Sequence, residues 1–315
     1  MKKKSISYAK WGYIFLIPFF VAYLIFAVVP LVQTFYFSVL DYKVDTGMAP
    51  DIFNPDSNVI NKGFCGLDNF TFALSEKGEF LKCLGNTFIV WIIGFIPQIV
   101  VSLVLAVWFT DIRLKLKAQG FFKTVIYLPN VIMASAISLL FYTLCIRNGA
   151  IDTLLNGNSD LALTEKVAGA RGIVGFINFI MWYGNTTIML MAAIMGIDTS
   201  LYESAQIDGA SPTQTFWKIT IPLIKPILAY VLVTSMIGGL QMFDVPQFIG
   251  GNQAGPKGSL KTVVMIIQNG KDSAIGTVGA ISVMIFIISA FLGFLTLKIM
   301  SDDSGKPKKK KPAKK

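Results

Sequence analysis

Six long runs without a charged side chain constrain this chain more than any other feature. Each run holds roughly 18 or more residues, the length that an α-helix needs to cross a hydrocarbon core of about 30 Å. The composition agrees, because 54% of the 315 residues are hydrophobic and the mean hydropathy is +0.62. The sequence therefore predicts an all-α, polytopic membrane protein with six transmembrane helices. These are Trp11–Leu40, Leu84–Thr110, Val125–Ile146, Gly172–Ile197, Pro226–Phe243 and Ser273–Leu297.

The basic residues predict how these helices are oriented. With the N-terminus in the cytoplasm, the inner segments hold about 18 of the 28 Lys and Arg residues, and the outer loops hold about 10. Because basic residues accumulate on the cytoplasmic side of membrane proteins, we expect a multi-pass protein of the cell membrane with both termini inside. The expected parts are a cytoplasmic N-terminus (residues 1–10), a transmembrane domain (11–300) and a basic cytoplasmic tail (301–315). The first apolar run is about 30 residues long without a clean cleavage site, so we expect a retained helix rather than a signal peptide.

The three outer loops differ in composition. The first, Asp41–Cys83, reads as an irregular cap with a short helix around Glu79–Leu84. The second, Arg147–Arg171, contains apolar residues that predict a short surface helix. The third, Val245–Asp272, is rich in glycine. Proline at positions 18, 30, 97 and 129 predicts bent helices, and small residues such as Gly276 and Gly279 predict close helix packing.

Few residues suit catalysis, metal binding or nucleic-acid binding. Histidine is absent, and the stretch Gly250–Lys257 comes near a phosphate-binding loop but has Pro256 where the lysine belongs. We therefore expect neither an enzyme nor a bound cofactor or metal. The net charge of +10 reflects the inside-outside asymmetry together with the Lys-rich tail, for which a solvated arm near anionic lipid is favoured over a nucleic-acid site. Cys65 and Cys83 could form a disulfide or remain two thiols.

Polar and aromatic residues cluster in the fourth and fifth predicted spans. Amides bind hydroxyl groups well, and flat aromatic faces match the apolar faces of pyranose rings. The alternative is that the amides join helices to one another and the aromatic residues lie at the membrane interface. For the single acid, Asp244, the choice is between a group at membrane depth and one just past the helix end. The candidate pathway residues are Asn178, Trp182, Tyr183, Asn185, Gln241, Phe243 and Asp244.

The segment between these two spans predicts a pair of short capped helices. Ser200 with Glu203 makes one capping box, and Ser211 with Gln214 makes a second with Pro212 at the first helical position. Asp208-Gly209 between them is a turn signal. Two helices that are too polar for lipid would present a rigid knob to a soluble partner. We therefore expect residues 198–218 to be a docking element.

This segment resembles the "EAA" loop of the inner-membrane permease subunits of type I ABC importers. The matching positions are Glu203, Ala205, Asp208, Gly209, Ala210, Ile219, Pro222 and Pro226, and Ser204 replaces the usual first alanine. Further stretches are similar to the sugar permeases of the maltose and glycerol-phosphate systems. They include GLDNF at Gly66, NTF at Asn86, GFFKTVIYLP ending at Pro129, GAIDTLL at Gly149, FD at Phe243 and AGP at Gly255.

The resemblance implies a type I ABC importer permease fold and a set of partners. These are a second homologous permease subunit, two ATP-binding cassette ATPase subunits that use the ATP, an extracytoplasmic sugar-binding protein and the lipid bilayer. It also implies that the coupling loop (residues 198–218) contacts an ATPase through Tyr202, Glu203, Ala205, Asp208, Gly209 and Ala210. The rival classes are a secondary carrier or channel, which would transport without ATP, and an integral membrane enzyme. Which sugar or polyol is carried stays open.

Overall fold

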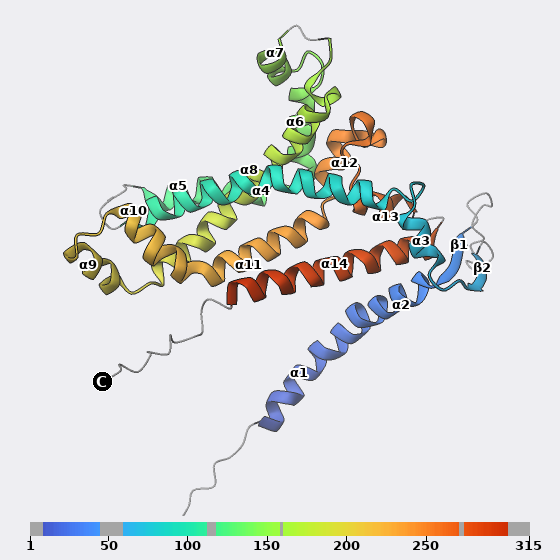
Figure 1. The fold of residues 1–315 in the computed structure, drawn as a ribbon, viewed down its shortest axis with the longest axis horizontal. Coiled ribbons are helices and arrows are strands. Elements are labelled where there is room, and N and C mark those ends of the chain that lie inside the picture. The colour runs from blue at the N-terminus through green and yellow to red at the C-terminus, as the bar shows by residue number, and fades with distance from the viewer. Residues whose placement is uncertain (1–8, 45–58, 112–117, 158–159, 271–273, 302–315) are drawn as a thin grey trace, which may run out of the picture. The chain divides into compact units, whose positions relative to one another are not determined.

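The computed structural model describes residues 9–44, 59–111, 118–157, 160–270 and 274–301 (Figure 1). Most of the two predicted terminal segments, and the basic residues Arg113, Lys115 and Lys117, lie outside the described residues. The chain divides into two compact units, Met1–Phe80 with Ile267–Phe286, and Leu81–Ile266 with Ile287–Lys315. Each unit is described by itself below.

Among the described residues, five helical segments are long and apolar enough to cross a membrane. They are Gly12–Ser38, Phe80–Thr110, Val167–Met195, Pro212–Leu240 and Ile275–Lys298. These segments confirm the first, second, fourth, fifth and sixth predicted spans, and most of their ends differ from the prediction by a few residues. The exception is the fifth span, which begins at Pro212, 14 residues before the predicted Pro226. The protein is thus a polytopic helical membrane protein.

The third predicted span is not one helix. Its residues form α5 (Gln119–Val131) and α6 (Ala134–Cys145), which are bent by 88° at the break between them. Pro129 donates no backbone N–H, and α5 ends two residues after it. The Asn130 side chain then donates a 3.0 Å hydrogen bond to the Met181 carbonyl, which anchors this end of α5 on another helix. The pair is a broken span or a re-entrant segment.

Two of the long helices contain a π turn just before a proline. The first lies between α1 (Ala9–Tyr23) and α2 (Val29–Ser38), and the second, Phe216–Thr220, precedes α11 (Ile221–Leu240). Each π turn closes when the residue before Pro30 or Pro222 donates to a carbonyl five residues back. The wider turn gives room for the proline ring, which would otherwise clash with the carbonyl four residues before it.

In the first unit, the described parts of the expected irregular cap form regular structure, and residues 45–58 of that loop lie outside the described residues. An antiparallel hairpin pairs β1 (Leu40–Val44) with β2 (Val59–Phe64), and α3 (Asp68–Leu74) follows. The apolar residues of β1 alternate with charged ones, which is the period of a strand. The short helix predicted around Glu79–Leu84 is instead the first turn of α4 (Phe80–Thr110).

Glycine allows the first half of α14 (Ile275–Ser301) to pack closely in this unit. A Cβ on Gly279 would lie 3.0 Å from the Ser38 backbone nitrogen, and one on Gly276 would meet the Leu40 carbonyl. Asn69 donates to the carbonyls of Ser38 (3.0 Å) and Leu40 (2.8 Å), so α3 fixes the end of α2. The close packing predicted at these glycines is confirmed.

In the second unit, α8 (Val167–Met195) forms the centre. The first half of α8 buries Val174, Ile177 and Met181 against α6 and α12 (Asp244–Gly250). The second half buries Leu190 and Met191 against α4 and α11. The glycine-rich third outer loop contains α12, two 3-10 turns and α13 (Val263–Gly270). After α8 come α9 (Thr199–Ile207) and α10 (Pro212–Thr215), at the left of Figure 1.

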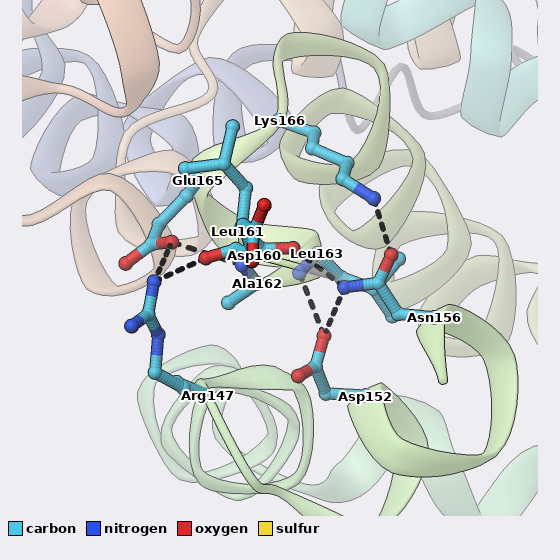
Figure 2. Close-up of polar contacts among 9 residues, drawn as sticks. All are labelled: Arg147, Asp152, Asn156, Asp160, Leu161, Ala162, Leu163, Glu165 and Lys166. Atoms are coloured by element: carbon cyan, nitrogen blue, oxygen red, sulfur yellow. Dashed lines mark hydrogen bonds and ion pairs between the residues drawn. The ribbon is translucent and has the colours of Figure 1, made fainter. Parts of the chain in front are cut away.

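The predicted surface helix of the second outer loop is confirmed as α7 (Ala150–Asn156). Leu154 and Leu155 are 83% and 76% exposed on it. Figure 2 shows the polar contacts that brace this helix against the 3-10 turn Leu163–Glu165. The buried Asp152 carboxylate accepts hydrogen bonds from the Leu163 backbone N–H (2.8 Å) and from the Asn156 side chain (3.1 Å). These contacts hold a projecting loop in one conformation.

Candidate functional site

The start of α9 is capped by a different residue from the one predicted. Asp198 is the N-cap, and its carboxylate accepts a 3.0 Å hydrogen bond from the Ser200 backbone N–H. That hydrogen bond lowers the pKa of Asp198 below its usual value, because it stabilises the charged carboxylate. The predicted capping box of Ser200 and Glu203 is therefore wrong, because the helix begins before Ser200. Glu203 is exposed on the second turn of α9.

The predicted turn at Gly209 is confirmed. Gly209 has a φ of +77°, and its N–H donates to the Gln206 carbonyl at 3.0 Å. The Ala210 N–H donates to the Ala205 carbonyl at 2.9 Å. Together these bonds form a Schellman motif, which ends a helix and requires the left-handed conformation that glycine adopts readily. Apart from its chain neighbours, no described residue has an atom within 4 Å of a Cβ placed on Gly209, so the backbone angle selects glycine here.

The second predicted capping box is confirmed, but it opens a long helix rather than a short one. The Gln214 N–H donates to the Ser211 hydroxyl at 3.3 Å, and the Ser211 N–H donates to the Gln214 side chain at 3.0 Å. From Pro212 the chain continues through α10, the π turn and α11 to Leu240 without interruption. The coupling loop is thus one free-standing helix, a glycine turn and the first turns of the fifth span.

The predicted coupling residues occupy this knob as follows. Tyr202, Ala205 and Ala210 are half-buried, whereas Glu203, Asp208 and Gly209 are exposed. Tyr202 and Glu203 also line a cavity of about 780 Å³ between α9 and the ends of α4 and α5. The sequence interpretation missed Ile207, which is 87% exposed at the end of α9. A large apolar side chain at the end of a mostly polar helix was the available signal.

A second cavity, of about 460 Å³, brings together most of the predicted pathway residues. Six of the seven line it: Asn178, Trp182, Asn185, Gln241, Phe243 and Asp244. Tyr183 does not line this cavity; its ring lies against Phe179 instead, with centroids 5.3 Å apart. The helical period explains the difference, because Asn178, Trp182 and Asn185 share one face of α8 and Tyr183 lies about 100° away from Trp182.

The structure places Asp244 relative to the helix end but not relative to the membrane. The fifth helix ends at Leu240, and Asp244 is the exposed first residue of α12 at the rim of the cavity. It therefore lies just past the helix end. The Asn178 amide donates to the Val174 carbonyl at 2.9 Å and approaches the Met242 sulfur at 3.3 Å, so part of its bonding capacity joins helices.

The sequence interpretation missed one wall of this cavity, which α4 supplies. Trp91 and Phe95 stack with ring centroids 5.1 Å apart and an interplanar angle of 19°. The Trp91 indole donates to the Ser235 hydroxyl of α11 at 3.1 Å, and Gln98 donates to the Thr186 hydroxyl of α8 at 2.8 Å. The spacing of Trp91, Phe95 and Gln98 by four and three residues places them on one helical face. That spacing could have been read from the second span.

Comparison with known proteins gives consistent matches. Residues 169–300 match the family described as "Binding-protein-dependent transport system inner membrane component". The chain is 30% identical to the lactose transport system permease protein LacF of Rhizobium radiobacter over 242 residues, which cover 73% of this chain and 80% of LacF. It is 25% identical to the multiple sugar-binding transport system permease protein MsmF of Streptococcus mutans, covering 92% of this chain and 94% of MsmF.

A solved structure has a similar fold. It is the crystal structure of a bacterial ABC transporter involved in the import of the acidic polysaccharide alginate. One of its chains superposes with a TM-score of 0.74 and 20% sequence identity, covering 94% of this chain and 96% of that chain.

Proposed function

The chain belongs to the binding-protein-dependent sugar permeases of ABC transporters, and from this membership we propose how its two sites divide the work. The cavity of the second unit is one half of a translocation pathway for a carbohydrate. The coupling loop receives the force of ATP hydrolysis from a cytoplasmic ATPase subunit. Residues 11–300 form the permease domain, and both termini lie in the cytoplasm.

The observation that carries this proposal is the continuity of the fifth helix. It begins at the Ser211 capping box beside the Gly209 turn, and its other end supplies Ser235, Gly238 and Gly239 to the cavity. A run of 29 residues as helix covers about 43 Å, which exceeds the thickness of a hydrocarbon core. A displacement of the knob can therefore reach the cavity through one continuous helix.

The lining of the cavity supports a carbohydrate as the transported solute. The Trp91–Phe95 stack and Trp182 offer flat apolar surfaces to pyranose rings. Asn185 and Gln241 offer amides that both donate to and accept from hydroxyl groups. Among the relatives, one is named for lactose and another for trehalose and maltose. We propose the carbohydrate class for this chain without narrowing it to one sugar.

The proposed partners follow from the same membership. The related alginate transporter has been crystallised in complex with an alginate pentasaccharide-bound periplasmic protein. For this chain we propose an extracytoplasmic sugar-binding protein, a second homologous permease subunit and two ATPase subunits. The chain itself binds no cofactor and performs no catalysis, and the ATPase subunits use the ATP.

Uptake into proteoliposomes tests the proposal. The tagged chain is purified with its neighbouring subunits, reconstituted, and supplied with the binding protein and radiolabelled maltose, trehalose, lactose or arabino-oligosaccharides. We expect one of these sugars to enter only when both ATP and the binding protein are present. Uptake by the chain alone, without ATPase subunits, would instead identify a secondary carrier or channel.

A further inference from the structure

A hydrogen bond joins the free-standing helix of the coupling loop to the fifth helix. The Tyr202 hydroxyl on α9 lies 3.1 Å from the Thr220 hydroxyl, 18 residues further along the chain. Thr220 is only 4% exposed and Tyr202 is half-buried, so the bond is partly buried at the wall of the cavity of about 780 Å³. A hydrogen bond between two hydroxyl groups is directional and is broken by a small displacement of either partner.

Thr220 is the last residue of a π turn. The Ile221 N–H donates to the Phe216 carbonyl, five residues back, and Pro222 follows directly with no N–H to donate. The helix is therefore held by fewer regular backbone bonds here than elsewhere along its length. A force on Thr220 therefore acts at the point where the backbone geometry of the fifth helix can change most easily.

The space beside this contact leaves α9 room to move. The cavity of about 780 Å³ is lined by Tyr202 and Thr220 together with Thr110 of α4 and Lys123 of α5. It separates α9 from the ends of those two helices. A displacement of α9 is therefore not transmitted by close packing on this side, and the hydroxyl contact is a direct route to the fifth helix.

We propose that Tyr202 and Thr220 form the mechanical link that carries a displacement of α9 into the π turn of the fifth helix. From there the displacement reaches the residues of α11 that line the cavity of about 460 Å³, among them Tyr230 and Ser235. Both members of the link are positioning residues, because they act through the helix and not on the sugar. The inference rests on the proposed function, since it presumes that a partner moves α9.

The test removes the link without changing the shape of the helix. Thr220→Val replaces the hydroxyl by a methyl group of similar size, whereas Thr220→Ser keeps the hydroxyl. The matched control is Thr215→Val, because Thr215 lines the same cavity but its hydroxyl donates within its own helix, to the Ser211 carbonyl at 3.1 Å. The readouts are sugar uptake and ATP hydrolysis, measured as phosphate release from the reconstituted complex. The binding protein is loaded with the sugar that the uptake assay identifies.

We expect Thr220→Val to lower the maximal binding-protein-stimulated ATP hydrolysis about five-fold. The concentration of binding protein that gives half-maximal stimulation should not change, because the docking face is untouched. Thr220→Ser and Thr215→Val should behave as the wild type. Adding Tyr202→Phe to Thr220→Val should cause no further loss, since both remove the same contact.

Three results would overturn the link. They are full stimulation of the Thr220→Val complex, equal losses in Thr220→Val and Thr215→Val, or additive losses in the double variant. If Thr220→Val reduces the yield of assembled complex, the Tyr202→Phe variant, which lacks one oxygen atom, is measured instead against the same criteria. A wild-type complex that shows no ATP-dependent uptake would refute the proposed function itself, which distinguishes the two failures.

Discussion

At the scale of single residues, the backbone of Gly209 is the clearest requirement of the coupling loop. Its φ of +77° lies in the region where a residue with a Cβ is strained by about 1 kcal/mol or more. The space around it is open, so a substitution does not disturb the packing of this chain. The strain instead changes how α9 is presented.

We predict that Gly209→Asp leaves the protein in the membrane but abolishes most ATP-dependent uptake. The changed turn tilts α9, and an added carboxylate stands on an exposed face of the knob. Membrane fractions would be probed for the chain, and vesicles for sugar uptake. The control is Gly120→Asp, because Gly120 is also exposed with no atom within 4 Å of its Cβ position but has an ordinary φ. Normal uptake by the Gly209 variant would contradict the role given to the turn.

Some side-chain roles within the site could be predicted from the sequence and others could not, and the difference has a physical cause. The Ser211–Gln214 box could be predicted because its two partners are local in sequence. The start of α9 could not be fixed, because Asp198 and Ser200 both suit an N-cap and only the backbone decides between them. Tyr183 was wrongly included among the cavity residues because it lies on another face of α8. Composition alone does not say which face of a helix lines a cavity.

At the scale of elements, the contact of α5 with α8 depends on a glycine. A Cβ on Gly184 of α8 would overlap the Ile126 carbonyl group of α5, and backbone atoms cannot move aside as a side chain can. We predict that Gly184→Ala separates the two helices and destabilises the protein by about 1–3 kcal/mol. The measurement is the thermal unfolding temperature of the purified complex in detergent.

The matched control for this change is on the same helix. Gly172→Ala places the same methyl group where no atom lies within 4 Å. It should leave the unfolding temperature unchanged or raise it slightly, because alanine favours the helix. Equal unfolding temperatures for the two variants would show that α5 and α8 do not meet closely at Gly184.

Elements whose formation depends on local hydropathy were predictable, and those that depend on distant contacts were not. The five long spans follow from length and apolar composition. The break between α5 and α6 is held by Asn130 bonding to Met181, 51 residues away, and the hairpin is held in part by Asn69 bonding to the Leu40 carbonyl. A sequence window of one element contains neither contact, so the sequence predicted a bend at Pro129 within a single third span, rather than two separate helices, and an irregular first loop.

At the scale of the whole molecule, the proposed function requires that the two ends of α8 lie on opposite sides of the membrane. The helix has 29 residues, about 43 Å in length, and α7 precedes it while α9 follows it. Each neighbour carries a highly exposed apolar side chain, Leu154 on α7 and Ile207 on α9. These two positions are therefore suited to reporting which side each end faces.

Cysteine labelling in intact cells gives the decisive measurement. The native thiols Cys65, Cys83 and Cys145 are first replaced by alanine, and Leu154→Cys and Ile207→Cys are then introduced separately. We predict that a membrane-impermeant maleimide labels position 154 in intact cells and labels position 207 only after the cells are made permeable. The two positions are matched in exposure, so a difference in labelling reflects sidedness and not burial. If position 207 reacts from outside, no cytoplasmic ATPase can reach α9, and the coupling proposed for this loop is wrong.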